Sequence, residues 1–227
     1  MLRHRRARCD ALAARLRDLA PDLMVVATYP YLLPQALLEL AGPGVLGLHP
    51  SLLPRHRGPA PLPWTYLADD AEAGVSVFWL EAEADAGPLC AQEVVPLARG
   101  RRLADLYAEL ARRGAALLRG TVEQVERGEA RREPQDRARA TAAPELGTPL
   151  AVDVSAWGAE RVWHVLRGIG EGREVEVRPG AARLAVGEVL ARGEGAGAAP
   201  GTIEPAAGGL RLWCRDGHVD LRGRRLG

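Results

Sequence analysis

The chain has 227 residues, enough for one large domain or for a medium domain and a small one. Its 30 basic and 29 acidic residues leave a net charge of +1, so no overall field favours nucleic acid or an anionic membrane. No apolar run approaches the roughly 20 residues that span a bilayer, and no apolar stretch follows the basic N-terminus as in a secretory signal. The three cysteines lack metal-ligand spacing. We expect a cytoplasmic protein with reduced thiols and no metal.

Two residue types are missing from the chain. It contains no lysine and no asparagine, and all of its side-chain positive charge at neutral pH is arginine. No lysine can therefore serve as a nucleophile, and no asparagine amide can serve a catalytic site.

The first elements alternate between helix and strand patterns. Apolar residues recur every three to four positions from Cys9 to Leu19, which predicts a helix that ends before Pro21. The apolar runs at 23–28 and 44–49 predict strands buried on both faces, with a short helix from Pro34 between them. This order favours parallel pairing with helical crossovers.

Further elements follow in the same half. Residues 74–87 begin as a strand and end in an acidic loop, 88–97 predict another strand, and 102–127 show the longest helical period. Residues 128–147 are charged and proline-containing without apolar periodicity, which is typical of a linker. His56, in the proline-rich loop at 50–63, is expected to be solvated.

After the linker, short segments predominate. Ser155 is expected to cap a helix over 159–168, and alternating segments from 173 to 223 predict a small antiparallel β-barrel or sheet. We therefore expect an α/β domain over 1–127, a linker over 128–147 and a β-rich domain over 148–227.

One pair of side chains carries chemistry in this scheme. His49 ends a predicted buried strand, and Asp85 lies in the loop after another strand. Ligands of α/β folds bind at such strand ends. A carboxylate there can orient an imidazole for acid–base work near neutral pH.

The motif around this pair resembles a known family. The stretch HPSLLPRHRGPAPLPW, with GVSV and EADAG downstream, is similar to the folate-dependent formyltransferases, and the C-terminal half resembles that of the methionyl-tRNA enzymes of this family. The resemblance implies a Rossmann-like formyltransferase domain followed by an OB-like β-barrel. It also implies that His49 and Asp85 are catalytic, and that an amine attacks the formyl carbon of 10-formyltetrahydrofolate through a tetrahedral intermediate.

The resemblance also implies binding residues. Leu32 and Leu33 on one side, and Glu81, Ala82 and Asp85 on the other, would hold the folate donor. Ser51, Arg55 and Arg57 are candidates for binding the amine acceptor, which could be an aminoacyl-tRNA, an amino sugar or a specialised metabolite.

Two departures from the family pattern leave alternatives open. The family asparagine falls on Gly47, and losing one such amide donor costs about 10²–10³ in rate. Restoring it by Gly47→Asn is expected to raise transfer. The family's further βαβ unit before the first helix is not in this sequence, which weakens the expectation of tRNA recognition. The alternatives are a degenerate, non-catalytic binding protein and, less favoured by the motif, a formyl-folate hydrolase.

Overall fold

The structure is a computed structural model that describes residues 6–29, 31–180 and 182–226, with side chains from residue 12 onward. It divides into two compact units. The first comprises the chain up to Trp64, Glu72–Pro96 and Tyr107–Pro144, and the second comprises Thr65–Ala71, Leu97–Leu106 and the chain from Glu145 on. The division at 128–147 that the sequence suggests stays a prediction.

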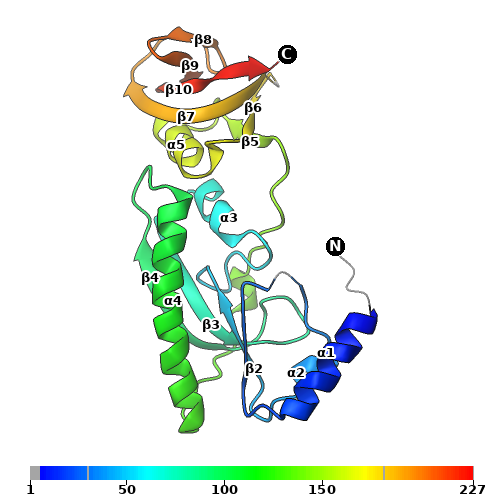
Figure 1. Cartoon of the computed structure of the whole chain (residues 1–227). Helices are drawn as coiled ribbons and strands as arrows, with labels where there is room; N and C mark the ends of the chain where they lie inside the picture. Colours follow the sequence, from blue (N-terminus) through cyan, green and yellow to red (C-terminus); the bar gives the residue numbers. More distant parts are fainter. Residues whose placement is uncertain (1–5, 30, 181, 227) are drawn as a thin grey trace. The chain divides into compact units, whose positions relative to one another are not determined.

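A four-stranded sheet in the order β1-β2-β3-β4 organises the first unit (Figure 1). β1 and β2 pair in parallel, as the alternation of helix and strand predicted. β3 runs antiparallel to both β2 and β4, so the sheet is mixed. The strands are β1 Met24–Ala27, β2 Val45–His49, β3 Glu72–Trp79 and β4 Leu89–Pro96.

Four α-helices precede or flank this sheet in the chain, and one of them was not predicted. Pro61 begins a short helix inside the stretch that the sequence suggested was all loop; proline suits a first helical position because the amide it lacks has no partner there. The helices are α1 Arg6–Leu19, α2 Gln35–Leu38, α3 Pro61–Leu67 and α4 Leu103–Glu126.

The long helix α4 provides the cover of the sheet (Figure 1). Its Leu117, Leu118 and Val122 pack against a buried cluster that includes Leu46 and Trp79. The periodicity predicted for 102–127 is therefore confirmed, because the apolar side of the helix is the side that meets the strands.

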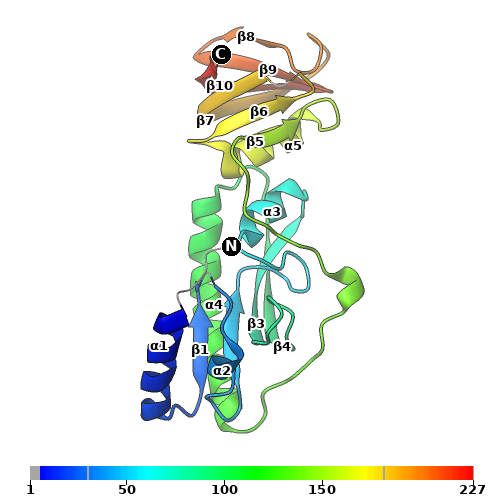
Figure 2. The same cartoon turned by 90° about the vertical axis from the view of Figure 1, so that its right-hand side faces the viewer.

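The apolar face predicted for the first helix is only partly buried. Leu12 and Leu19 are 43% and 73% exposed, whereas Ala13 is buried. The side chain of Cys9 lies outside the described part. β1 stands at the sheet edge in Figure 2, and its Val25 is 44% exposed. Among the described residues, no helix combines the length and apolar character that crossing a membrane requires.

The second unit contains a six-stranded sheet in the order β5-β6-β7-β10-β9-β8. β5 and β6 are parallel and every other neighbouring pair is antiparallel. The β-rich character is confirmed, and the ordering of the described strands is open rather than closed on itself. The strands are β5 Leu150–Asp153, β6 Glu174–Arg178, β7 Ala182–Glu194, β8 Ile203–Ala206, β9 Gly209–Cys214 and β10 Gly217–Leu226.

The predicted cap of helix α5 (Ala159–Val165) was wrong. The N-cap residue is Gly158, and a carboxylate oxygen of Asp216 accepts from the first helical amide at 2.7 Å. The Ser155 hydroxyl instead donates to Asp153 at 2.7 Å in the preceding turn. The cap comes from the distant turn between β9 and β10, which local sequence cannot show.

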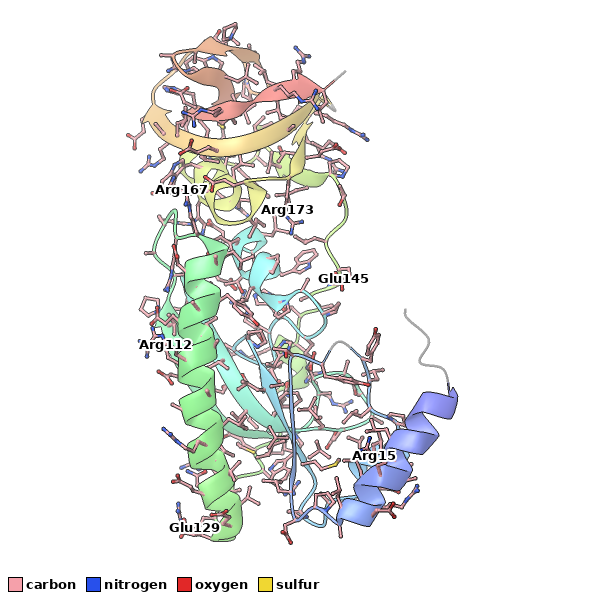
Figure 3. The ribbon with its side chains drawn as sticks, viewed as in Figure 1. Arg15, Arg112, Glu129, Glu145, Arg167 and Arg173 are labelled. Atoms are coloured by element: carbon pink, nitrogen blue, oxygen red, sulfur yellow. The ribbon has the colours of Figure 1, made fainter. Side chains whose placement is uncertain are left out.

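A buried histidine joins α5 to two earlier segments of the same unit. His164 is 0% exposed, stacks on Tyr66 with ring centroids 5.0 Å apart, and accepts from the Gly100 amide through Nδ1 at 3.0 Å. The Tyr66 hydroxyl donates to the Arg101 carbonyl at 2.9 Å. Arg167, labelled in Figure 3, donates to the Gly100 carbonyl at 3.1 Å.

Candidate active site

Polar side chains of β3 and β4 form hydrogen bonds to the backbone of the loop that follows β2. The Ser76 hydroxyl donates to the Ser51 carbonyl at 2.6 Å and accepts from the Leu53 amide at 3.1 Å. Gln92 donates to Ser76 and to the Leu53 carbonyl, both at 2.8 Å. Because Ser76 is fully buried, each of these bonds would be costly to leave unmade.

His49 stands at the end of β2 with oxygen atoms facing both ring nitrogens. Nε2 lies 2.9 Å from the His56 carbonyl, which can only accept, so this nitrogen donates. Nδ1 lies 3.7 Å from Oδ1 of Asp85. Both contacts are attractive together only when both nitrogens carry a proton. Asp85 is thus the carboxylate that faces the ring nitrogen not engaged by the His56 carbonyl.

Asp85 reaches this position from the loop after β3. Its Oδ2 accepts from the Gly58 amide at 2.7 Å, which leaves Oδ1 facing His49. Its backbone adopts a left-handed conformation with φ of 52°, which aspartate tolerates better than most residues. Gly58, with φ of 119°, is in a conformation that suits glycine, and a side chain there would also meet the Ala143 carbonyl.

His56 is buried, contrary to the expectation that it is solvated. It is 5% exposed, its φ is 58°, and its amide donates to the Thr141 hydroxyl at 2.8 Å. Its carbonyl is the one that faces His49. The cover comes from a segment about eighty residues later in the chain, so the loop sequence alone gave no sign of it.

That cover is the chain that follows α4, residues 129–144, which starts at Glu129 (Figure 3) and is drawn as a loop with one short helical turn (Figure 2). It forms two backbone bridges, Leu89 with Glu133 and Arg57 with Ala142. The Trp64 indole adds a bond to the Pro144 carbonyl at 2.8 Å. The segment predicted as a linker is therefore held against the loop after β2.

One side chain of this segment reaches both site loops. Oε1 of Gln135 accepts from Nε and Nη2 of Arg57 at 3.2 and 2.8 Å. Its Nε2 donates to the carbonyls of Asp85 and Gly87 at 2.9 and 2.7 Å. Sequence analysis missed Gln135, because a single glutamine in a charged stretch has no local pattern.

The residues predicted to bind the donor lie on exposed loops. Leu32 is 54% exposed, Leu33 is half-buried, and Glu81 and Ala82 are exposed. Leu32 and Leu33 belong to the connection between β1 and α2, and the others to the connection between β3 and β4. Their role in folate binding stays a prediction.

The residues predicted to bind the acceptor are largely engaged within the protein. The Ser51 hydroxyl is buried and donates to the Arg55 carbonyl at 2.7 Å. Arg57 is bonded to Gln135 and pairs with Glu83 at 3.5 Å, and its side chain is 12% exposed. Arg55 is half-buried in the same turn. Their role in acceptor binding also stays a prediction.

The space beside Gly47 is filled. A Cβ built at Gly47 would lie 2.7 Å from Cε1 of Phe78 and 2.8 Å from Cδ2 of Leu80. Phe78 is the antiparallel partner of Gly47 across β2 and β3, and it is 2% exposed. Its ring meets that of His49 edge-on at 6.5 Å between centroids. An added asparagine would therefore displace a packed aromatic ring.

Two other residue types are accounted for. Cys90 and Cys214 are free and buried, and burial raises the pKa of the Cys90 thiol to about 11, so this thiol stays protonated at neutral pH. Within the described ranges, no three His, Cys, Asp or Glu side chains gather closely enough to hold a metal ion.

Comparison with known proteins identifies the class to which this site belongs. A family model described as formyl transferase matches residues 1–122. The methionyl-tRNA formyltransferase of Pelobacter propionicus is 32% identical over 232 residues, covering 100% of this chain and 70% of that protein. That of Roseiflexus castenholzii is 44% identical over 134 residues, covering 59% of this chain and 43% of that protein.

Solved structures share the fold. HypX from Aquifex aeolicus in complex with tetrahydrofolic acid has a TM-score of 0.66 at 22% identity, covering 94% of this chain and 37% of that chain. Glycinamide ribonucleotide transformylase 1 from Symbiobacterium toebii has a TM-score of 0.53 at 27% identity, covering 59% of this chain and 65% of that chain. The chain belongs to the formyl transferase family.

Proposed function

We propose that this chain transfers a formyl group from 10-formyltetrahydrofolate to an amine. The observation that carries the proposal is the facing of His49 Nδ1, at the end of β2, and Asp85 Oδ1, in the loop between β3 and β4, at 3.7 Å in a chain of the formyl transferase family. We further propose an OB-like character for the second unit and a cytoplasmic location.

The pair suits the proton movement that formyl transfer needs. When bound, the donor supplies a formyl carbon whose bond to the donor nitrogen breaks as the bond to the amine forms. The amine must lose a proton, and the departing nitrogen must gain one. Because Nε2 of His49 is bonded to the His56 carbonyl, Nδ1 is the nitrogen that exchanges a proton, and Asp85 stabilises the charged ring. Such a group contributes about 10²–10⁴ in rate.

The exposed loops fit a folate donor. Leu32 presents a large apolar surface that suits a flat heterocycle, and a heterocycle rich in donors and acceptors can bond to the backbone of the exposed loop at Glu81 and Ala82. The same loop ends in Asp85, so binding there would bring a formyl group toward the His49 pair.

The relatives support one acceptor class among the amines that the sequence left open. The curated relatives named above are methionyl-tRNA formyltransferases, which supports an aminoacyl-tRNA, and an amino sugar remains the other amine class. A second candidate function is a folate-binding protein without turnover. It is favoured by Phe78 and Leu80, whose side chains fill the room that an amide at position 47 would need.

Calorimetry with a stable 10-formyltetrahydrofolate analogue tests the proposal first. The wild-type chain should bind it in the micromolar range, and Asp85→Ala should weaken binding. Assays with methionyl-tRNA and with an amino sugar nucleotide should then show formylated product for one of them.

The outcomes separate the candidates. A folded protein that does not bind the analogue overturns the proposed function. Binding without product from either amine moves the assignment to the folate-binding protein. Product that persists in His49→Ala removes the histidine from the reaction.

A further inference from the structure

Gln135 is less exposed than its neighbours in the sequence. Residues 131–134 and 136–139 are exposed, whereas Gln135 is half-buried and points to the two site loops. The amide uses its whole hydrogen-bonding capacity, since Oε1 accepts twice and Nε2 donates twice. Arginine only donates and carbonyls only accept, so the orientation of the amide is unambiguous.

The backbone around Gln135 is fixed on both sides. Before it, Leu89 and Glu133 exchange two backbone bonds of 2.8 and 3.0 Å. After it, Asp136 accepts from the Ala138 amide at 3.0 Å and caps the 3-10 helix η1, Arg137–Arg139. The side chain therefore starts from a defined position and does not have to be ordered by its own contacts alone.

Gln135 contacts the loop that carries Asp85, and the conformation of this loop places the carboxylate opposite His49. Asp85 has a left-handed backbone, and its carboxylate must point back at His49. Two donated hydrogen bonds to the carbonyls of Asp85 and Gly87 fix the path of the chain at this residue and just after it. The accepted bonds fix Arg57, whose following residue, Gly58, donates to Asp85 Oδ2.

We propose that Gln135 is a positioning residue that sets the distance and direction between the His49 imidazole and the Asp85 carboxylate, with Arg57 as its partner. This inference rests on the proposed function for its kinetic consequence, and on geometry alone for its structural one. It assigns a role in the reaction to the segment after α4. It also gives Arg57 a task that requires no contact with the acceptor.

The test uses two variants that separate donation from packing. Gln135→Met keeps the length of the side chain and removes all four bonds. Gln135→Glu keeps an acceptor for Arg57 but places a carboxylate against two carbonyls. Gln124, a half-buried glutamine near the end of α4, supplies the matched controls Gln124→Met and Gln124→Glu.

The first measurement needs no folate. The ¹⁵N signal of His49 Nδ1 is recorded on histidine-labelled protein and assigned through its loss in His49→Ala. Asp85→Ala supplies the signal of an imidazole that has lost its carboxylate. Both Gln135 variants should move toward that signal, and both Gln124 variants should match the wild type.

The second measurement is kinetic. Displacing a reacting group by about 1 Å costs on the order of 10²-fold, so kcat should fall about 10- to 100-fold in both Gln135 variants while KM for the amine stays unchanged. Arg57→Met should lower kcat similarly, and the double variant Arg57→Met/Gln135→Met should be little worse than either single one, because both changes break the same bridge. A rise in KM for the amine in Arg57→Met would assign that residue to acceptor binding instead.

An unchanged His49 signal in both Gln135 variants, or wild-type kcat in both, overturns the inference. Absence of transfer by the wild type overturns only the proposed function, because the His49 signal still reports whether Gln135 positions the pair.

Discussion

Two buried histidines of this chain, His49 and His164, have different surroundings. His49 is 7% exposed, and both of its nitrogens face oxygen atoms, one of them a carboxylate. His164 is 0% exposed, accepts a hydrogen bond from the Gly100 amide through Nδ1, and has no hydrogen-bond partner at Nε2 among the described residues. Burial lowers the pKa of His164 to about 4, and nearby Arg99 adds to the effect.

The difference teaches that burial alone does not mark a catalytic histidine. His164 acts as a neutral acceptor that joins α5 to the segment around Gly100, and its stacking on Tyr66 is a packing contact. His49 has a backbone carbonyl facing Nε2 and a carboxylate facing Nδ1. His49 differs from His164 because it faces the carboxylate of Asp85. That carboxylate lies on a loop distant in the sequence and accepts a hydrogen bond from the Gly58 amide.

Substituting each histidine separately should give the largest difference in the rate of formyl transfer. His49→Ala should lower the rate of formyl transfer about 10²–10⁴-fold, since it removes the proposed acid–base group, and should lower the melting temperature, because the His56 carbonyl loses its buried partner. His164→Gln, which can still accept from Gly100, should retain the wild-type rate. Single-turnover formylation and thermal unfolding of both variants provide the measurements. Equal losses of rate in His49→Ala and His164→Gln would contradict the distinction between the two histidines.

The pH dependence of the free energy of unfolding should also reveal the surroundings of His164. The folded-state pKa of His164, about 4, lies below its ordinary value of 6.5, so the folded protein favours the neutral ring. The stability that the neutral His164 ring contributes is fully present above about pH 6.5. It is lost as the pH falls toward 4, because over this range the unfolded chain binds a proton at this histidine and the folded protein does not. The free energy of unfolding should fall by ~3 kcal/mol through this group.

Urea unfolding from pH 7 to pH 4 measures this effect. His164→Gln should show a shallower slope over that window, and His218→Gln serves as a control at another histidine of the same unit. Identical slopes for the wild type and His164→Gln would contradict the prediction.

The smallest effect concerns Gly47, two residues before His49. Because the Phe78 ring and the Leu80 side chain fill the space, Gly47→Asn should destabilise the chain by about 1–3 kcal/mol and should not raise transfer by itself. This revises the expectation from the sequence. Phe78→Leu makes room, so the double variant should transfer faster than Phe78→Leu alone. Denaturation and rate measurements on the three variants check both parts.

The sequence predicted the elements whose pattern is local. The apolar runs that became β1 and β2 and the period of α4 were visible because each is a pattern of adjacent residues. Burial on both faces was confirmed for β2 and was wrong for β1, whose residues alternate between half-buried and exposed because it lies at the sheet edge. β5 was missed because four residues after Pro149 have too little pattern, and its pairing is with β6, over twenty residues later.

The site was predictable only in its chemistry. His49 and Asp85 could be named because their residue types suit acid–base work, and the structure brings them to 3.7 Å. The burial of His56 and the bridge through Gln135 depend on a segment that returns across the loops from far along the chain. Its charged sequence indicates solvent, and its inward side chain is one residue among many outward ones.

The two bridges of that segment also decide where its length can change during evolution. Glu133 and Ala142 are each paired with a fixed partner, so an insertion or deletion between them would shift Gln135 out of register with Asp85. Residues between the end of α4 and Glu133, and those beyond Pro144, carry no such constraint from the bridges. Variation in chain length should therefore collect outside residues 133–142, and a change within them should appear together with a replacement at position 135.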